Sequence, residues 1–276
     1  MHFRAKLTQL WAYAGMGMAA AAVLFLFFYV FAQGASAISW EFLTQPPKGA
    51  VLGEEGGIFP AIMGSIAFTL TAIVLGTIPA IASALFMVFY CRSQRLEAAI
   101  RLVVQCISGI PSIVLGLFSY SFLVRDLGWG RCILSSGVAL AIMILPFIEV
   151  RAEKAFRELP RSVIQSSYAL GCSKAHTIFK IVLPACRGEL VSGVILGGCY
   201  ALGATAPLIF TGAVAYAATP ISLMKPAMAL PLHLYLLVAQ GATSMDIAYG
   251  TAFVMMALIL VSNLLATFYA NRSKRV

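Results

Sequence analysis

The stretch LVVQCISGIPSIVLGLFSYSFLV, residues 102–124, contains no charged side chain. It is longer than the roughly 20 apolar residues that a helix needs to cross a bilayer. Residues 12–39 form a second uncharged run of this kind. Both runs are typical of membrane-spanning helices.

The composition of the whole chain agrees with this reading. Of its 276 residues, 61% are hydrophobic and only 11% are charged, against about 25% charged in an ordinary soluble domain. A soluble core of this length would need a larger charged surface. The composition therefore excludes a soluble enzyme, a disordered chain and a small disulfide scaffold, and it predicts an all-α polytopic integral membrane protein.

The apolar runs predict six transmembrane helices. The expected spans are Ala12–Ala32, Ile62–Tyr90, Leu102–Val124, Ile133–Ile148, Leu190–Thr211 and Ile247–Ala270. The second is longer than a bilayer requires, so we expect it to tilt or protrude.

The basic residues sort to one side of these spans. Fifteen of the 19 Lys and Arg residues fall in the N-terminal tail, the 91–101 and 151–187 loops and the C-terminal tail. Cytoplasmic loops carry such an excess, so the pattern predicts a cytoplasmic (inner) membrane protein with both termini in the cytoplasm. The net charge of +9 thus indicates topology, and we expect no nucleic-acid partner.

Two other features of the sequence give little information about function. Residues 35–37 (Ala-Ser-Ala) resemble a signal-peptidase site, but the preceding apolar run exceeds the about 7–15 residues of a signal peptide, so we expect a retained first span. The six cysteines show no CxxC or CxxH spacing, which predicts neither a metal site nor a disulfide framework.

The predicted spans are poor in ionisable groups and rich in proline. Apart from Glu189 at one edge, they contain no Asp, Glu, Lys or Arg, but prolines lie inside four of them: Pro79, Pro111, Pro146 and Pro207. Each proline removes a backbone donor. Hydroxyl side chains near two of these positions indicate either helix kinks with local hydroxyl bonding or a polar pathway. Gly193 and Gly197 form a GxxxG pattern, which indicates close helix packing.

The longest polar segment between spans runs from Arg151 to Arg187. It contains QSSYALG at residues 165–171 and, nine residues later, IVLP at residues 181–184. The glycine permits a chain reversal, and we expect Pro184 to end the second helical stretch before the next span.

This segment resembles the coupling loop of ABC-importer permeases, whose pattern is Glu-Ala-Ala, three residues, Gly, nine residues, Ile-x-Leu-Pro. Gly171, Ile181, Leu183 and Pro184 match that pattern in type and spacing. Gln165, Ser166 and Ser167 stand where the family has Glu-Ala-Ala. The resemblance implies that these seven residues form the contact with an ATPase.

Three further stretches resemble the permease subunits of phosphate importers. They are GGIFPAIMGS at 56–65, SGIPSIVLGLF at 108–118 and LGATAPL at 202–208. The resemblance implies a PstA-type subunit with the type I (MetI-like) fold, and a division into residues 1–55 (tail, first span and periplasmic loop), 56–271 (transport domain, coupling loop 151–187) and 272–276 (tail).

It also implies the partners, which are a second permease subunit of the PstC type, two ATPase subunits, a periplasmic phosphate-binding protein and the lipid bilayer. The chain has no GxxxxGK[ST] segment, so ATP and Mg²⁺ are expected on the ATPase partners and this chain is expected to bind no cofactor and carry no catalytic residue.

The chain departs from the family where an anion pathway is expected. The fifth-span pattern Arg-Ala-x-Gly-Glu-Thr-Ala-Pro-Leu has Tyr200 and Ala204 in place of its Arg and Glu. On the fourth span, Glu153 fits the family's Glu, but Val150 takes the position of the Arg and Arg151 follows it. The candidate pathway residues are Ser112, Arg151, Glu153, Tyr200 and Thr205.

Three alternatives stay open. The chain can be a type I permease for another oxyanion or small solute, or a transport-impaired signalling subunit. A membrane enzyme is the third, although no HExxH, Ser-Lys or aspartyl dyad supports it.

Overall fold

The computed structural model describes residues 2–49, 51–241 and 244–273, with side chains described from residue 9 to residue 270 within those ranges. Lys274 and Arg275, which we expect in the cytoplasmic tail, lie outside the described residues. The chain divides into two compact units, residues 1–58 with 234–257 and residues 59–233 with 258–276.

The first unit holds a long N-terminal helix, a short helix and a pair of short strands. Helix α1 (His2–Gly34) is followed by α2 (Trp40–Thr44) and a two-stranded antiparallel ladder of β1 (Pro47–Lys48) and β2 (Glu55–Gly56). Ser39 caps α2, since its Oγ accepts a hydrogen bond from the amide of Phe42 at 3.1 Å. The unit also includes the end of α11 (Leu230–Gln240) and the start of α12 (Met245–Ser273).

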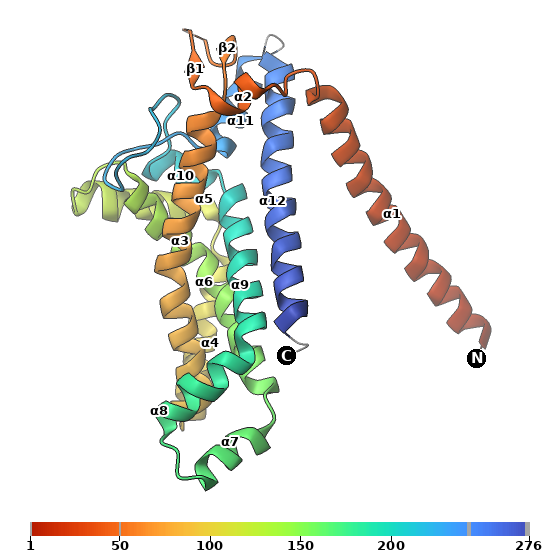
Figure 1. The fold of residues 1–276 in the computed structure, drawn as a ribbon, viewed down its shortest axis with the longest axis vertical. Coiled ribbons are helices and arrows are strands. Elements are labelled where there is room, and N and C mark those ends of the chain that lie inside the picture. Colours follow the sequence, from red (N-terminus) through yellow and green to blue (C-terminus); the bar gives the residue numbers. More distant parts are fainter. Residues whose placement is uncertain (1, 50, 242–243, 274–276) are drawn as a thin grey trace. The chain divides into compact units, whose positions relative to one another are not determined.

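The second unit is a helical bundle in which α6 is central (Figure 1). Helix α6 packs against α3 and α9, and α3 packs against α9. The elements are α3 (Phe59–Leu85), η1 (Phe86–Tyr90), α4 (Gln94–Gly109), α5 (Ser112–Ser119), η2 (Tyr120–Asp126), α6 (Ile133–Glu158), α7 (Arg161–Ala169), α8 (Lys174–Thr177), η3 (Ile178–Val182), α9 (Leu183–Gly203) and α10 (Ala206–Thr211). The three η elements are π-helical turns.

Small residues let the three central helices approach closely. A Cβ on Gly76 of α3 would lie 3.0 Å from the carbonyl oxygen of Ala141 on α6, and one on Gly197 of α9 would lie 3.2 Å from Cγ1 of Ile148. Gly193 of α9 lies against the side-chain stem of Arg151. The GxxxG pattern therefore has the packing role that the sequence predicts.

Within the described residues, four helices are long and apolar enough to cross a membrane: Gln9–Gly34, Phe59–Tyr90, Ile133–Glu158 and Met245–Ala270. They correspond to the first, second, fourth and sixth predicted spans. The second is 32 residues long, in keeping with the excess length that the sequence predicts.

The third predicted span, Leu102–Val124, is not one continuous helix. Helices Gln94–Gly109 and Ser112–Asp126 are bent by 98° at a break, where Ile110 has φ −73° and ψ 126°. The ring of Pro111 disfavours the helical conformation for the residue before it. Pro79 and Pro146 lie inside α3 and α6 instead, so a proline in an apolar run does not by itself locate a break.

The fifth predicted span, Leu190–Thr211, is also divided. Helix α9 ends at Gly203, and α10 begins at Ala206 with Pro207 in its first turn. Helix α9 begins earlier than predicted and includes Arg187 and Glu189. This pair of helices is not among the long apolar helices of the described residues.

Pro184 does not end a helix, contrary to the prediction. The backbone of Val182 and Leu183 is helical on both sides of the junction between η3 and α9. The amide of Leu183 donates to the carbonyl of Ile178, five residues back. This widened π turn precedes the proline, and such turns are single-turn insertions within helices.

Candidate functional site

Helices α7 and α8 form a turn at one end of the second unit (Figure 1). We call residues 161–177 the α7–α8 segment. Gly171 makes the reversal with φ +78°. Its amide donates to the carbonyl of Tyr168 at 2.9 Å, and the amide of Cys172 donates to that of Ser167 at 3.2 Å. This is the Schellman arrangement, in which glycine is favoured because it has no Cβ.

A buried hydrogen bond holds the two helices together. The hydroxyls of Ser167 and Thr177 are 2.8 Å apart, and both residues are buried. Ser167, predicted to face an ATPase, thus points into the segment. Its neighbours Gln165 and Ser166 are exposed.

The tip of the segment exposes apolar side chains. Leu170, beside the turn, is 83% exposed, and Phe179, in the following π turn, is 66% exposed. Tyr168 is also exposed. Large apolar groups at such exposure cost free energy in water and are typical of a surface that binds another protein.

The rest of the motif anchors the segment to the bundle. Leu183 packs on a core cluster formed by α3, α6, η3 and α9. Ile181 is half-buried and Pro184 is exposed. Lys174 also connects the segment to η1. Its ammonium group donates to the carbonyl of Phe89 and lies 3.9 Å from the ring centre of Tyr90.

A closed network of four charged side chains joins α4 to α6. Arg101 contacts Glu97 at 3.1 Å and Glu153 at 2.6 Å, and Arg157 contacts the same two carboxylates at 2.6 and 2.7 Å. The Glu153 side chain is only 10% exposed. Each carboxylate is therefore shared by two guanidinium groups.

Arg151 lies on a different face of α6 from Glu153. It is exposed, and its Nη1 lies 3.4 Å from Oγ of Ser192 on α9. One turn earlier on α6, the ring of Phe147 lies 4.6 Å from that of Tyr200. Arg151 and Tyr200 thus belong to one exposed stripe along the α6–α9 pair, and Glu153 does not.

Ser112 and Thr205 stand at the two helix breaks. Ser112 begins α5, and Thr205 precedes α10. Helices α5 and α10 pack against each other, and a Cβ on Gly116 would lie 2.9 Å from Cα of Pro207. Arg131 donates to the carbonyls of Ile209 and Ala213 at 2.9 and 2.5 Å, which ties down the end of α10.

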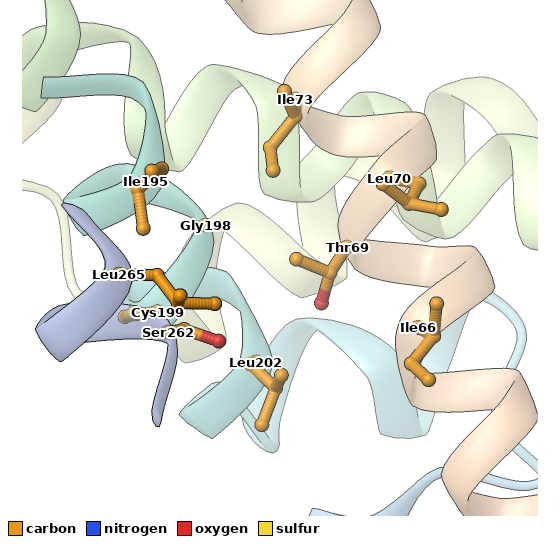
Figure 2. Close-up of a pocket in the computed structure, with 10 residues that line it drawn as sticks. All are labelled: Ile66, Thr69, Leu70, Ile73, Ile195, Gly198, Cys199, Leu202, Ser262 and Leu265. Atoms are coloured by element: carbon orange, nitrogen blue, oxygen red, sulfur yellow. The ribbon is translucent and has the colours of Figure 1, made fainter. Parts of the chain in front are cut away.

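A cavity of about 290 Å³ opens among α3, α9 and the second-unit part of α12. Figure 2 shows that its walls are mostly aliphatic, with Thr69 facing Gly198 and Leu202. The Thr69 hydroxyl is buried without a hydrogen-bond partner. None of the predicted pathway residues lines this cavity, and its aliphatic walls offer an anion no charge.

Within the described residues, no group of three or more His, Cys, Asp or Glu side chains is arranged to hold a metal ion.

Residues 80–275 match the family described as the inner membrane component of binding-protein-dependent transport systems. The chain belongs to this family. It is therefore a multi-pass permease component of the inner membrane, non-catalytic in itself, whose transport system includes an ATPase and a binding protein on other chains.

The names of similar proteins are consistent with a transport permease. This permease is 31% identical over 207 residues, 75% of this chain and 73% of the relative, to a probable phosphate transport system permease protein PstA of Methanocaldococcus jannaschii. It is 29% identical over 86% of its length, and 85% of the relative, to a probable ABC transporter permease of Bacillus subtilis, YqgI. A PstA of Pasteurella multocida is 27% identical over 90% of this chain and 88% of its own.

Among solved structures, the permease is similar to a chain of the inward-facing MetNI methionine ABC transporter. The TM-score is 0.62, at 18% identity, with 77% of this chain and 94% of that chain covered. This likeness shows the MetI-like fold.

Sequence reasoning about this permease missed the partners of Glu153. Two of the four ion pairs, Glu97–Arg101 and Glu153–Arg157, have the i,i+4 spacing that favours a helix-surface pair and were recognisable in the sequence. The two cross-helix pairs were not, because they depend on how α4 lies against α6.

Proposed function

We propose that this permease forms half of a translocation pathway for inorganic phosphate, driven by ATP hydrolysis on separate subunits. The observation that carries the proposal is the agreement between the phosphate-importer motifs and the relatives named PstA. A second permease subunit of the PstC type, two ATPase subunits and a periplasmic phosphate-binding protein would complete the transporter.

The proposed orientation places the α7–α8 segment and both termini in the cytoplasm. Seven basic residues lie between Arg151 and Arg187, and the positive-inside rule puts such a segment on the cytoplasmic side. Its exposed tip at Leu170 would then reach an ATPase.

We propose that the segment transmits movement of the ATPases to the helical bundle. The Ser167–Thr177 hydrogen bond makes α7 and α8 one body, and Lys174 and Leu183 connect that body to η1 and to the core. Closure of the ATPases would move this body, and α9, which continues from it, would follow. The arrangement supports alternating access, in which the pathway between the two permeases opens first to one side of the membrane and then to the other.

The exposed α6–α9 stripe is the proposed pathway face. Phosphate carries one to two negative charges, and moving it through lipid without compensation is prohibitive. Arg151 supplies one positive charge at the cytoplasmic end, Tyr200 supplies a hydroxyl, and Ser112 and Thr205 supply two more at the breaks. With Tyr200 where the family has an arginine, the partner permease would contribute most of the positive charge.

The test is the ATPase activity of the reconstituted complex with its binding protein. Phosphate is expected to stimulate ATP hydrolysis, and sulfate and molybdate are expected to leave it at the basal rate. Stimulation by sulfate or molybdate alone would reassign the solute, and an assembled complex that no solute stimulates would favour the signalling subunit.

A second candidate, a permease for another oxyanion or small solute, is favoured by one observation. The ring of Tyr200 contacts that of Phe147 in a tilted arrangement, so the position that carries an arginine in the family is part of an aromatic pair here. In that case a solute other than phosphate stimulates the same complex.

A further inference from the structure

A second cavity lies where two membrane-spanning helices end. It has a volume of about 480 Å³ and is lined by Val88, Phe89, Phe156, Arg157, Leu159, Arg161 and Ile164. Small-molecule sites are about 300–1,000 Å³ and combine apolar walls with a few polar groups. This cavity meets both conditions.

The apolar walls are well defined. Phe156 is buried, and its ring meets that of Phe89 edge to face with 6.0 Å between centres. Leu159 and Ile164 pack on the same core cluster as Phe89. The cavity is therefore part of the packed end of the bundle.

The polar groups of the cavity are two arginines. Arg157 uses Nε and Nη2 for the carboxylates of Glu153 and Glu97, which leaves Nη1 outside both ion pairs. The four-residue network is neutral as a whole, so Arg161 adds an excess positive charge. Lys174, held against Phe89, lies near the same wall, and the acidic Glu158 faces Lys154 at 3.7 Å.

The position of the cavity favours a particular ligand. Phe89 lies in the last turn of the span that ends at Tyr90, and Phe156 and Arg157 lie in the last turn of the span that ends at Glu158. The positive-inside pattern predicts that both of these helix ends lie on the cytoplasmic side. Basic pockets between transmembrane helices on that side can bind anionic lipid head groups.

We propose that this cavity binds a phosphate group, with Arg161 and Nη1 of Arg157 as its donors and the two phenylalanines as its apolar wall. The phosphate can belong to an anionic phospholipid or be free inorganic phosphate. Because the cavity adjoins the start of α7, an occupant would fix the angle at which α7 leaves α6. The inference does not depend on which solute the permease transports.

The experiment is native mass spectrometry of the purified transporter complex in detergent. Phosphatidylglycerol or phosphatidylcholine is added in steps, with and without inorganic phosphate. The wild-type complex is expected to prefer phosphatidylglycerol by about tenfold, because the choline cation of phosphatidylcholine opposes the binding of its phosphate beside two arginines, or to bind inorganic phosphate that displaces it. Displacement would assign the site to free phosphate, and its absence to the lipid.

Three variants locate the site. Arg161→Ala is expected to abolish the preference, whereas Arg95→Ala removes the same charge from an exposed position outside the cavity and is expected to change it less than about twofold. Ile164→Trp keeps every charge and fills the cavity, so it is expected to lower binding as well. Equal binding of the two lipids without phosphate binding, equal losses in Arg161→Ala and Arg95→Ala, or full binding by Ile164→Trp would each overturn the proposal.

Discussion

The buried core of α3, α6 and α9 and the α7–α8 segment differ in what their apolar side chains contact. In the core, glycines bring helices into contact, and Ile144 and Ile148 are fully buried. Leu170 in the segment and Phe179 in the π turn that follows it are mostly exposed. These contacts lie within this chain, whereas we propose that another protein covers the tip of the segment.

The same contrast applies to polar groups. The segment satisfies its buried hydroxyls internally through Ser167 and Thr177. On α6, two glutamates one turn apart differ: Glu153 is shared by two arginines, whereas Oε1 of the buried Glu149 has no hydrogen-bond partner. We therefore expect stability and transport to depend on different residues of neighbouring helices.

The largest effect is expected from crowding the core. Gly76→Leu would force a side chain against the backbone of Ala141, and overpacking of this kind costs about 1–3 kcal/mol or more. We expect loss of the folded permease, measured as the monodisperse fraction in size-exclusion chromatography. Gly17→Leu is the matched control, because a Cβ on Gly17 meets nothing within 4 Å. Equal yields of the two variants would contradict the packing described for α3 and α6.

The next effect concerns the two glutamates. Glu153→Gln leaves two guanidinium groups with one carboxylate, and we expect a loss of about 1–3 kcal/mol, because the carboxylate is buried and the arginines are partly exposed. Glu149→Gln removes no hydrogen bond or ion pair, so its thermal unfolding midpoint is expected to stay at or above that of the wild type. The reverse order of midpoints would show that the network does not stabilise α6.

The particular residues also show how far sequence reasoning reaches. Gly171 was predicted to make a chain reversal because a local pattern fixes its conformation, and the Schellman hydrogen bonds confirm it. Pro111, Pro184, Pro79 and Pro146 look alike in sequence, yet one breaks a span and three stay within helical backbone. The difference depends on neighbouring turns and packing that no single residue encodes.

In the candidate site, too, some features follow from a local sequence pattern and others depend on packing between segments. The spacing that suggests a coupling loop is local, and the structure places most of the motif on one exposed turn and its anchor. The burial of Ser167 and the separation of Glu153 from Arg151 depend on how α7 meets α8 and how α4 meets α6. Such contacts between segments distant in sequence could not be predicted from one chain.

A smaller effect is expected at the turn itself. Gly171→Ala places a Cβ on a residue with φ +78°, which costs about 1–2 kcal/mol, although no atom lies close enough to clash. The permease should fold and insert, and ATP-driven uptake should fall because the tip is displaced. Uptake per inserted permease, compared with Gly109→Ala, where the added Cβ also meets nothing within 4 Å, is the measurement. Equal uptake by the two variants would show that the turn conformation is not needed for coupling.

The smallest effect on folding and a selective effect on transport are expected at Arg151. Arg151→Ala removes one exposed side chain from the α6–α9 stripe, so we expect unchanged unfolding and a several-fold lower rate of phosphate uptake at matched expression. Unchanged uptake would place Arg151 on a solvated face without a role in the pathway.

We propose above that the tip of the α7–α8 segment binds the ATPase. The most direct measurement is photo-crosslinking in the assembled transporter, with a benzophenone side chain placed at Leu170 or, as a control, at Ile221. Both side chains are highly exposed, at 83% and 92%, but they lie in loops predicted for opposite sides of the membrane. We expect a crosslink to the ATPase from position 170 and none from position 221. A crosslink from 221 and none from 170 would contradict it.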